Sequence, residues 1–369
     1  MTTPLVSPEG RALDLPPRPT PVIRPGEFRF AAAGLAHGHI YGMTRGLLEA
    51  GATLTAVWDE DPALVAGFCR AFPQVRPARC LDELLDDPAL ALVASAAVPA
   101  DRCGLGLRVM EAGKDYFVDK APLTSLDQLA AARTAAARTG RKYMVYYSER
   151  LHSEAATLAD WLVGRGAIGR VIHMEGFGPH RLGAARPGWF YSKARTGGIL
   201  CDIGSHQLEQ FLHFTGAERA CITSARRANY AHPDHPEFED FGDCTATAAN
   251  GATGYFRVDW FTPAGLRNWG DGRTFLLGTE GYIEMRKYID ITAPEMVENT
   301  VLWVDGEGEH RFNATGQVGC PFFGRLIRDC LDRTETAMTQ AHAFAAAELC
   351  LQAQAIADRS AAQAAPGRP

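Results

Sequence analysis

The sequence lacks the long apolar runs and the excess of basic residues that mark two large classes of protein. None of its segments approaches the roughly 18–20 consecutive apolar residues that a membrane span requires. The formal net charge of the 369 residues is −6, which is not the basic footprint of a nucleic-acid-binding protein. We therefore expect neither a membrane nor a nucleic acid as a partner.

Paired cysteines are also missing. The nine cysteines stand singly and none forms a Cys-x-x-Cys pair, so the sequence indicates neither a zinc site nor a thioredoxin-like redox motif. Residues 1–10 lack a basic region followed by an apolar one, so we expect no secretory signal. These features predict mostly buried thiols in a reducing, cytoplasmic environment.

The composition is that of a folded globular protein, with 46% hydrophobic and 22% charged residues. The length is sufficient for roughly two domains. Prolines are concentrated at the N-terminus, where residues 1–27 show no periodic apolar face. We expect these residues to form an extended arm, which is either a disordered tail or a segment that lies on a partner subunit.

Residues 28–148 alternate between short apolar segments and helical patterns, which predicts a doubly wound parallel sheet. Helix-start signals support the pattern: Asp61 precedes Pro62, and Ser125 is followed three residues later by Gln128. The predicted strands are residues 28–33, 54–58, 91–98, 116–118 and 142–147, and the helices between them include 81–85, 101–112 and 125–138.

This alternation ends after Ser148, and residues 149–360 indicate a second, α+β domain with a large, mostly antiparallel open sheet. Asn250-Gly251 is a strong hairpin signal between two of its strands. The predicted strands are 170–176, 244–249, 252–260, 273–277, 281–286 and 300–304; the predicted helices are 153–165, 200–214 and 337–358. Residues 361–369 are predicted to be a tail.

The turn after the first predicted strand is a candidate dinucleotide site. It reads Gly34-Leu35-Ala36-His37-Gly38-His39, with Ala36 and His39 at the second and third glycine positions of G-x-G-x-x-G. Asp59 follows the next strand, 25 residues beyond Gly34, where a carboxylate accepts from both ribose hydroxyls and repels a 2′-phosphate. This favours NAD over NADP. The alternative is an ordinary turn in which Asp59 caps the next loop.

Two further segments carry polar groups suited to chemistry. Lys120 follows a predicted strand in Asp119-Lys120-Ala121-Pro122, at the sheet edge where ligands of α/β proteins bind; otherwise it is a solvated loop lysine. Asp202 and His206 follow Gly197-Gly198 and lie four residues apart, on one face of a helix. The alternative is a helix-terminal aspartate and a core histidine. A metal would need a third ligand, which the sequence does not indicate.

Together these three segments resemble the Gfo/Idh/MocA family (glucose–fructose oxidoreductase / inositol dehydrogenase / MocA). The family's E-K-P motif corresponds to residues 119–122, with Asp119 in place of Glu and Ala121 inserted before Pro122. Its G-G-x-x-x-D-x-x-x-H motif matches residues 197–206, and its T-P-x-x-x-H segment corresponds to residues 98–103. The resemblance covers about residues 28–358 and implies a Rossmann domain followed by an open-sheet domain.

The resemblance also implies residue roles. Lys120, Asp202 and His206 form the expected catalytic group of an NAD-dependent oxidoreductase that acts on a secondary alcohol of a sugar, sugar derivative or cyclitol. His206 removes the hydroxyl proton, Lys120 polarises the oxygen, and Asp202 orients His206 or binds a neighbouring hydroxyl. The expected cofactor-binding residues are Gly34, Ala36, His37, Gly38, His39, Asp59, Pro99 and Lys120.

Two other functions stay open at this point. One is glycoside cleavage or epimerisation through a transient keto-sugar, with NAD regenerated. The other is a dinucleotide-binding protein without catalysis.

The loop 177–195 is the expected substrate wall, with Arg195 as a further polar group. The expected substrate-binding residues are Arg150, His152, His180, Arg181, Trp189 and Tyr191, although Trp189 and Tyr191 are equally well explained as interdomain packing. An open sheet has one face to bury, which favours a homodimer or homotetramer.

Overall fold

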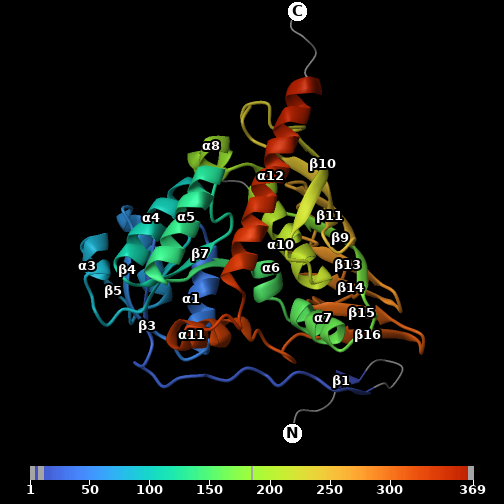
Figure 1. The fold of residues 1–369 in the computed structure, drawn as a ribbon, viewed down its shortest axis with the longest axis horizontal. Coiled ribbons are helices and arrows are strands. Elements are labelled where there is room, and N and C mark those ends of the chain that lie inside the picture. The colour runs from blue at the N-terminus through green and yellow to red at the C-terminus, as the bar shows by residue number, and fades with distance from the viewer. Residues whose placement is uncertain (1–4, 7–11, 184–185, 365–369) are drawn as a thin grey trace, which may run out of the picture.

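The computed structural model describes residues 5–6, 12–183 and 186–364, and it contains two large β-sheets that stand side by side, besides a two-stranded sheet in the N-terminal arm. Figure 1 shows the smaller sheet and its helices on the left and the larger sheet on the right, with α12 (Gln340–Ala364) running between them. Two sheets of this kind, one parallel and one mostly antiparallel, are the predicted fold class, which is confirmed.

The first sheet has six parallel strands in the order β5-β4-β3-β6-β7-β8. The chain leaves β3 in one direction and returns to its other side with β6, so the ends of these two strands flank a crevice suited to ligands. The strands are β3 Arg29–Ala33, β4 Thr53–Trp58, β5 Arg76–Pro77, β6 Leu92–Ser95, β7 Asp115–Asp119 and β8 Tyr143–Tyr146.

Local capping sets where the helices of this sheet begin. The Asp61 carboxylate accepts from the Ala63 N–H at 2.8 Å at the start of α2, and the Ser125 hydroxyl accepts from the Gln128 N–H at 3.2 Å at the start of α5. The helices are α1 His39–Glu49, α2 Pro62–Ala71, α3 Leu81–Leu85, α4 Pro99–Glu111 and α5 Leu126–Thr139.

The second sheet has eight strands in the order β10-β11-β12-β9-β13-β14-β15-β16, and only the pair β12–β9 is parallel. The Asn250-Gly251 hairpin joins β11 to β12, and Gly251 has the positive φ of +87° that this turn requires. The strands are β9 Val171–Pro179, β10 Ala220–Ala228, β11 Phe241–Ala248, β12 Thr253–Asp259, β13 Arg273–Gly278, β14 Tyr282–Arg286, β15 Thr300–Val304 and β16 Glu309–Asn313.

Helices cover one face of this second sheet. The single helix predicted over 200–214 is two helices, because Gly198 and Ile203 cap a short α9 and a longer α10. The pattern also missed α11, which packs against α1 of the first sheet, and the strands β5, β10 and β16. The remaining elements are α6 Ser148–Leu151, α7 Glu154–Gly164, the 3-10 helix Gly188–Tyr191, α8 Lys193–Thr196, α9 Ile199–Asp202, α10 Gly204–Thr215 and α11 Phe322–Asp332.

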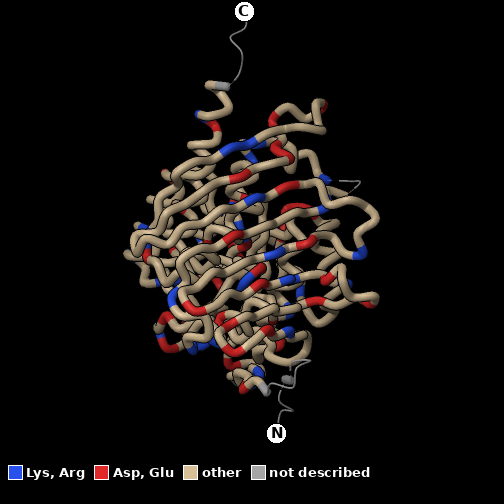
Figure 2. Tube along the Cα trace, turned by 90° about the vertical axis from the view of Figure 1, so that its right-hand side faces the viewer, with Lys and Arg blue, Asp and Glu red and all other residues tan. Residues whose placement is uncertain are grey.

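The other face of the large sheet is not covered by any helix of the described residues. Figure 2 looks onto this face and shows the strands crossing it, with acidic and basic residues scattered among them. Leu277 and Tyr282 are large apolar side chains on these strands, and each is 37% exposed.

The N-terminal arm packs on its own chain. Figure 1 shows it running beneath both sheets. At one end β1 Leu5–Val6 pairs with β2 Ala12–Leu13, and the Asp14 carbonyl accepts from the Trp161 indole N–H at 2.8 Å. At the other end the Val22 N–H donates to the Ala50 carbonyl at 3.0 Å. Residues 1–4 and 7–11 of the predicted arm, and residues 365–369 of the predicted tail, lie outside the described residues. Within the described chain, no helix combines the length and apolar character needed to cross a membrane.

Candidate active site

The turn between β3 and α1 has the backbone geometry of a dinucleotide site. Gly34 has a φ of +75°, and a Cβ placed on it would lie 2.6 Å from the Cβ of Ala97, so only glycine fits. The Leu35 N–H donates to the Asp59 carboxylate at 2.6 Å, and the Asp61 N–H donates to its other oxygen at 2.8 Å. Asp59 therefore does cap the neighbouring backbone.

These residues also fit an NAD(P) cofactor. A Cβ placed on Gly38, just before α1, would meet no atom within 4 Å, so space is open at the helix N-terminus where a pyrophosphate binds. Each oxygen of Asp59 retains a lone pair for a ribose hydroxyl. Pro99 begins α4 on the other side of the crevice, next to the strand end whose Ala96 carbonyl accepts from the His37 N–H at 2.9 Å.

A buried aspartate ties the two histidines of this turn to the neighbouring strand end. His37 Nδ1 lies 3.0 Å from one oxygen of Asp119, and His39 Nδ1 lies 2.8 Å from the other. Arg102 also donates to Asp119, at 3.1 Å. Burial opposes ionisation of Asp119, but His39, Arg102 and His37 hold the pKa of its carboxyl well below the usual range. The ligand atoms of His37, His39 and Asp119 lie close enough together to hold a metal ion. The two histidine–Asp119 distances are nevertheless those of ordinary hydrogen bonds.

Lys120 and Asp202 join the two halves of the molecule. The Lys120 ammonium donates to the Asp202 carboxylate at 2.5 Å, from the end of β7 to the end of α9. The Lys120 side chain is only 4% exposed and Asp202 is 18% exposed. Burial opposes ionisation of Asp202, but the lysine lowers the pKa of its carboxyl to about 2. Asp202 binds Lys120, and among the described residues no hydrogen bond joins it to His206, so its expected role of orienting His206 or binding a neighbouring hydroxyl stays a prediction.

His206 lies in the first turn of α10 and is 1% exposed. Burial is the main cause that lowers the pKa of its imidazole to about 3, so the ring is neutral at pH 7. The His206 ring lies 6.3 Å from the His39 ring, measured between centroids. The crevice thus brings the dinucleotide turn, Lys120, Asp202 and His206 to one place, from three separate segments of the chain.

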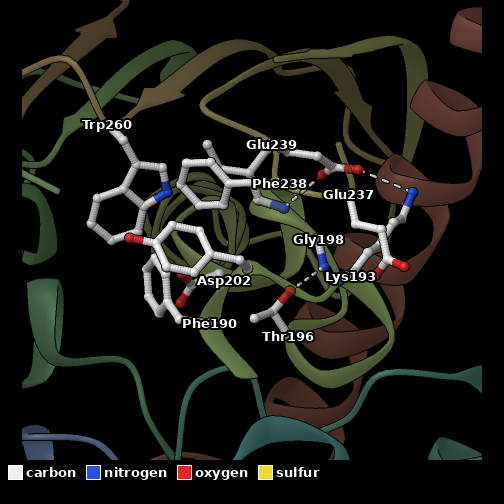
Figure 3. A pocket seen from close by; sticks show the side chains of 11 residues that line it. Phe190, Lys193, Thr196, Gly198, Asp202, Glu237, Phe238, Glu239 and Trp260 are labelled. Atoms are coloured by element: carbon white, nitrogen blue, oxygen red, sulfur yellow. Dashed lines mark hydrogen bonds and ion pairs between the residues drawn. The ribbon is translucent and has the colours of Figure 1, made fainter. Parts of the chain in front are cut away.

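Aromatic side chains form a wall beside Asp202. Figure 3 shows Trp260 and Phe190 gathered around Asp202, and Lys193 paired with Glu239 on the opposite side of the same pocket, at 3.0 Å. Tyr191 also lines the pocket, and its ring stacks on His235 with centroids 3.7 Å apart.

The expected substrate-binding residues divide into two groups. His180 lies at the site: its ring packs against Trp260 with centroids 5.4 Å apart, and Lys120 and Asp202 both influence its pKa, which burial lowers to about 4. Tyr191 lines the pocket as described.

The other expected substrate-binding residues make contacts with protein groups outside this pocket or beside it. Arg150 forms an ion pair with Glu209, and Arg181 donates to three loop carbonyls at residues 263, 266 and 268. His152 lies 2.5 Å from the Tyr146 hydroxyl, and Arg195 pairs with Asp101 at 2.5 Å. Trp189 packs edge-on against Phe190.

Sequence reasoning missed several residues around this site. Glu149 and Lys287 form a buried ion pair at 2.6 Å, and Asp119 and Arg102 lie behind the cofactor turn. Arg186 lies over the rings of Phe190 and Trp260, 4.8 and 5.2 Å from their centroids. Charged residues that are buried only through tertiary contacts leave no periodic signal in the sequence. The one available signal was the position of Glu149, which lies two residues after the end of the predicted strand 142–147.

Comparison with known proteins gives one family. A model described as the GFO/IDH/MocA C-terminal domain matches residues 158–284. A crystal structure from Erwinia carotovora atroseptica SCRI1043, described as that of an oxidoreductase, is 53% identical, with a TM-score of 0.87; the match covers 89% of this chain and 98% of that one.

Two curated relatives come from Bacillus subtilis (strain 168). The NAD(+)-dependent scyllo-inositol 2-dehydrogenase is 27% identical over 54% of this chain and 56% of its own. The NADP(+)-dependent scyllo-inositol 2-dehydrogenase IolW is 24% identical over 43% of this chain and 45% of its own. This chain therefore spans about half the length of the curated relatives that it matches.

Proposed function

The chain belongs to the Gfo/Idh/MocA family of oxidoreductases, and from this premise we propose that it is an NAD-dependent dehydrogenase of a secondary alcohol in a sugar, sugar derivative or cyclitol. We further propose that its cofactor-binding domain ends near residue 148, after the last strand of the parallel sheet, and that residues 149–360 form the substrate domain.

The observation that carries the proposal is the Lys120–Asp202 ion pair beside a neutral, buried His206. In the proposed reaction the Lys120 ammonium donates to the reacting oxygen and stabilises developing negative charge on it. His206 accepts the hydroxyl proton as general base. Asp202 holds the Lys120 ammonium in place. A bound nicotinamide supplies the hydride acceptor.

The choice of NAD over NADP rests on Asp59. Its carboxylate stands at the end of β4, where the adenine ribose of a dinucleotide lies, and its charge disfavours a 2′-phosphate. Both dependences occur among the relatives, since the two Bacillus subtilis enzymes are named for NAD(+) and NADP(+).

The substrate is proposed to lie against the wall formed by Trp260, Phe190 and Tyr191, with His180 as a hydrogen-bonding group. Aromatic faces pack well against the C–H surface of a sugar ring, and the polar groups bind its hydroxyls. The uncovered face of the large sheet, with Leu277 and Tyr282 exposed on it, supports a homodimer or homotetramer.

A panel of sugars, inositols and keto-sugars with NAD and with NADP, followed by nicotinamide absorbance, tests this function. We expect stoichiometric NADH with at least one polyol and a lower rate with NADP. Product formation without net NADH would instead support redox-neutral cleavage or epimerisation. Tight cofactor binding with no turnover across the panel would support a non-catalytic dinucleotide-binding protein.

A further inference from the structure

A network of buried polar side chains adjoins the helix turn that carries His206. The Glu149 carboxylate accepts from Lys287 Nζ at 2.6 Å and from Gln207 Nε2 at 2.8 Å. Lys287 also donates to Gln210 at 3.2 Å, and Gln210 donates to the His206 carbonyl at 2.8 Å. Glu149 and Lys287 are each 1% exposed, and the two glutamines are fully buried. An ion pair this deep is costly to desolvate, so a role beyond stability is worth testing.

Two atoms of this region complement each other. Among the described residues, His206 Nδ1 and Glu149 Oε1 are both buried without a protein hydrogen-bond partner; the Gln207 amide oxygen is a third such atom, but it carries no negative charge and is the weaker acceptor. Buried polar atoms are nearly always satisfied, by protein or by internal water. A carboxylate oxygen is only an acceptor, and an imidazole nitrogen that carries a proton is a donor. The part of the chain that the structure describes contains no direct hydrogen bond between them, so a single bridging water, donating to Glu149 and accepting from the imidazole, would satisfy both atoms.

Glu149 is also the acidic group that acts most strongly on His206. Charged or titratable groups face the imidazole from four segments: Lys120 after β7, His39 at the start of α1, His180 after β9, and Glu149 in α6. Burial and the first three groups lower the pKa of His206, whereas Glu149 raises it. The burial penalty on Glu149 is in turn overcome by Lys287 and His206, which help to hold the pKa of the Glu149 carboxyl at about 2.

We propose that Glu149 is a positioning residue for His206: its free oxygen anchors, through one bridging water, the hydrogen bond that Nδ1–H donates, and so selects the tautomer in which Nε2 is unprotonated. This inference rests on the proposed role of His206 as general base. During the reaction the hydroxyl proton of the alcohol would pass to His206 Nε2. The carbon that bears this hydroxyl would lose a hydride, for which a bound nicotinamide would be the acceptor. Glu149 stays ionised throughout, and Lys287 and Gln207 hold it in place.

The tautomer of His206 is directly measurable without any substrate. Two-bond ¹H–¹⁵N spectra of histidine-labelled protein at pH 7.5 distinguish Nδ1–H from Nε2–H rings, and His206→Asn assigns the signal. We expect the Nδ1–H form in the native protein and a shift toward Nε2–H in Glu149→Gln, whose amide donates instead. An unchanged tautomer in Glu149→Gln would overturn the proposal, whether or not the enzyme turns over a polyol.

A double variant separates positioning from simple charge compensation. Glu149→Gln alone leaves Lys287 unpaired in the core, so Glu149→Gln/Lys287→Met restores a neutral interior and preserves the fold. With an active substrate we expect kcat of the double variant to fall by about 10–100-fold, the KM for NAD to stay unchanged, and the acid limb of kcat/KM to move to lower pH. Recovery of native kcat and native tautomer would mean that Glu149 only neutralises Lys287, and would refute the proposal.

Thr274→Val is the matched control. The Thr274 hydroxyl belongs to the same network, 3.3 Å from Lys287 Nζ, but among the described residues no hydrogen bond joins it to Glu149. We expect this variant to change stability and to leave the His206 tautomer and the pH profile as in the native protein. A change in either equal to that of Glu149→Gln would show that any disturbance of the network suffices, and would count against a specific role for Glu149.

Discussion

At the scale of single residues, the Lys120–Asp202 ion pair decides how His206 can act. Asp202 accepts from Lys120 at 2.5 Å, and among the described residues no hydrogen bond joins it to the His206 imidazole. The pair holds the Lys120 side chain inside the crevice, where it is only 4% exposed. In the proposed reaction, the neutral imidazole of His206 accepts the proton.

Replacing His206 with Ala is expected to lower kcat by about 10²–10⁴-fold, because a general base typically contributes that much. NAD affinity should stay nearly intact, since His206 belongs to α10 and not to the dinucleotide turn. Steady-state kinetics and calorimetric titration with NAD measure the two effects. His173→Ala is the control, because His173 lies on β9 of the large sheet, where its Nδ1 is 2.7 Å from the exposed Thr253 hydroxyl. Full activity in His206→Ala would rule out this assignment.

Asp59→Asn tests cofactor choice at the other end of the crevice. The amide oxygen still accepts from the Leu35 N–H, but the charge that repels a 2′-phosphate is gone. A hydrogen bond to a charged group contributes about 1.5–3 kcal/mol, so we expect the preference for NAD over NADP to fall by roughly 10–100-fold in kcat/KM. Asp61→Asn, at the exposed cap of α2, should leave the ratio unchanged. A ratio equally unchanged in Asp59→Asn would mean that Asp59 is only a turn cap.

At the scale of elements, the N-terminal arm connects parts of the molecule that belong to different sheets. Its first end contacts Trp161 of α7, and its second end contacts Ala50 after α1. Gly51 has a φ of +103°, and a Cβ there would lie 2.7 Å from the Ile23 carbonyl, so the arm sits tightly on this turn. The arm is therefore part of the fold of its own chain, whatever else it contacts.

Deleting residues 1–26 should spare the fold but lower Tm by a few degrees. Val22 and Ile23 pack against the core, and each buried aliphatic side chain contributes about 1.5–3 kcal/mol before the ordering entropy of the arm is subtracted. Thermal unfolding measures the loss, and deletion of residues 1–11 is the control that keeps both contact points. Light scattering on the same samples reports oligomer size. A smaller oligomer would show that the arm also contacts a partner, and an unchanged Tm would contradict its structural role.

At the scale of the whole molecule, charged contacts hold the two sheets around the crevice. Lys120–Asp202 is one, and Arg195 of α8 pairs with Asp101 of α4 at 2.5 Å as another. The α12 helix adds Arg133–Glu348 at 2.6 Å, from α5. The proposed site depends on both sheets, because neither one alone holds the dinucleotide turn together with His206.

Histidines with buried or half-buried rings should make stability strongly dependent on pH. Burial lowers the pKa of His37, His152 and His180 to about 4, and that of His206 to about 3. The unfolded chain binds these protons near pH 6.5, so stability is fully present above that value and is lost as pH falls toward 4. Each histidine adds up to about 1.4 kcal/mol per pH unit to the slope in this window.

Thermal unfolding between pH 7.5 and pH 5 measures this loss, and His152→Asn should reduce the slope because Asn keeps a partner for the Tyr146 hydroxyl without titrating. The carboxylates add a second loss at lower pH, since the pKa of Glu149 and that of Asp202 are each held at about 2. A Tm that stays constant from pH 7.5 to pH 5 would contradict the burial of neutral histidines.

The sequence by itself determined the parallel sheet, most of its helix boundaries and the segments that carry the site. Caps such as Asp61 and Ser125, the Asn250-Gly251 turn and the apolar periodicity act within a few residues, so they are visible in the linear chain. The strands that the pattern missed are short or lie at sheet edges, as β5, β10 and β16 do, where burial leaves a weaker alternation.

Only the tertiary structure decided which charged groups meet. Lys120 finds Asp202 across 82 residues, and Glu149 finds Lys287 across 138. Arg150, expected in the site, is held by Glu209 instead. Such pairs follow from how two sheets and α10 pack together, because a buried charge takes whichever opposite charge the packing places within reach. The local sequence pattern therefore identified the segments that carry the candidate site, and long-range packing determined which charged groups in them form ion pairs.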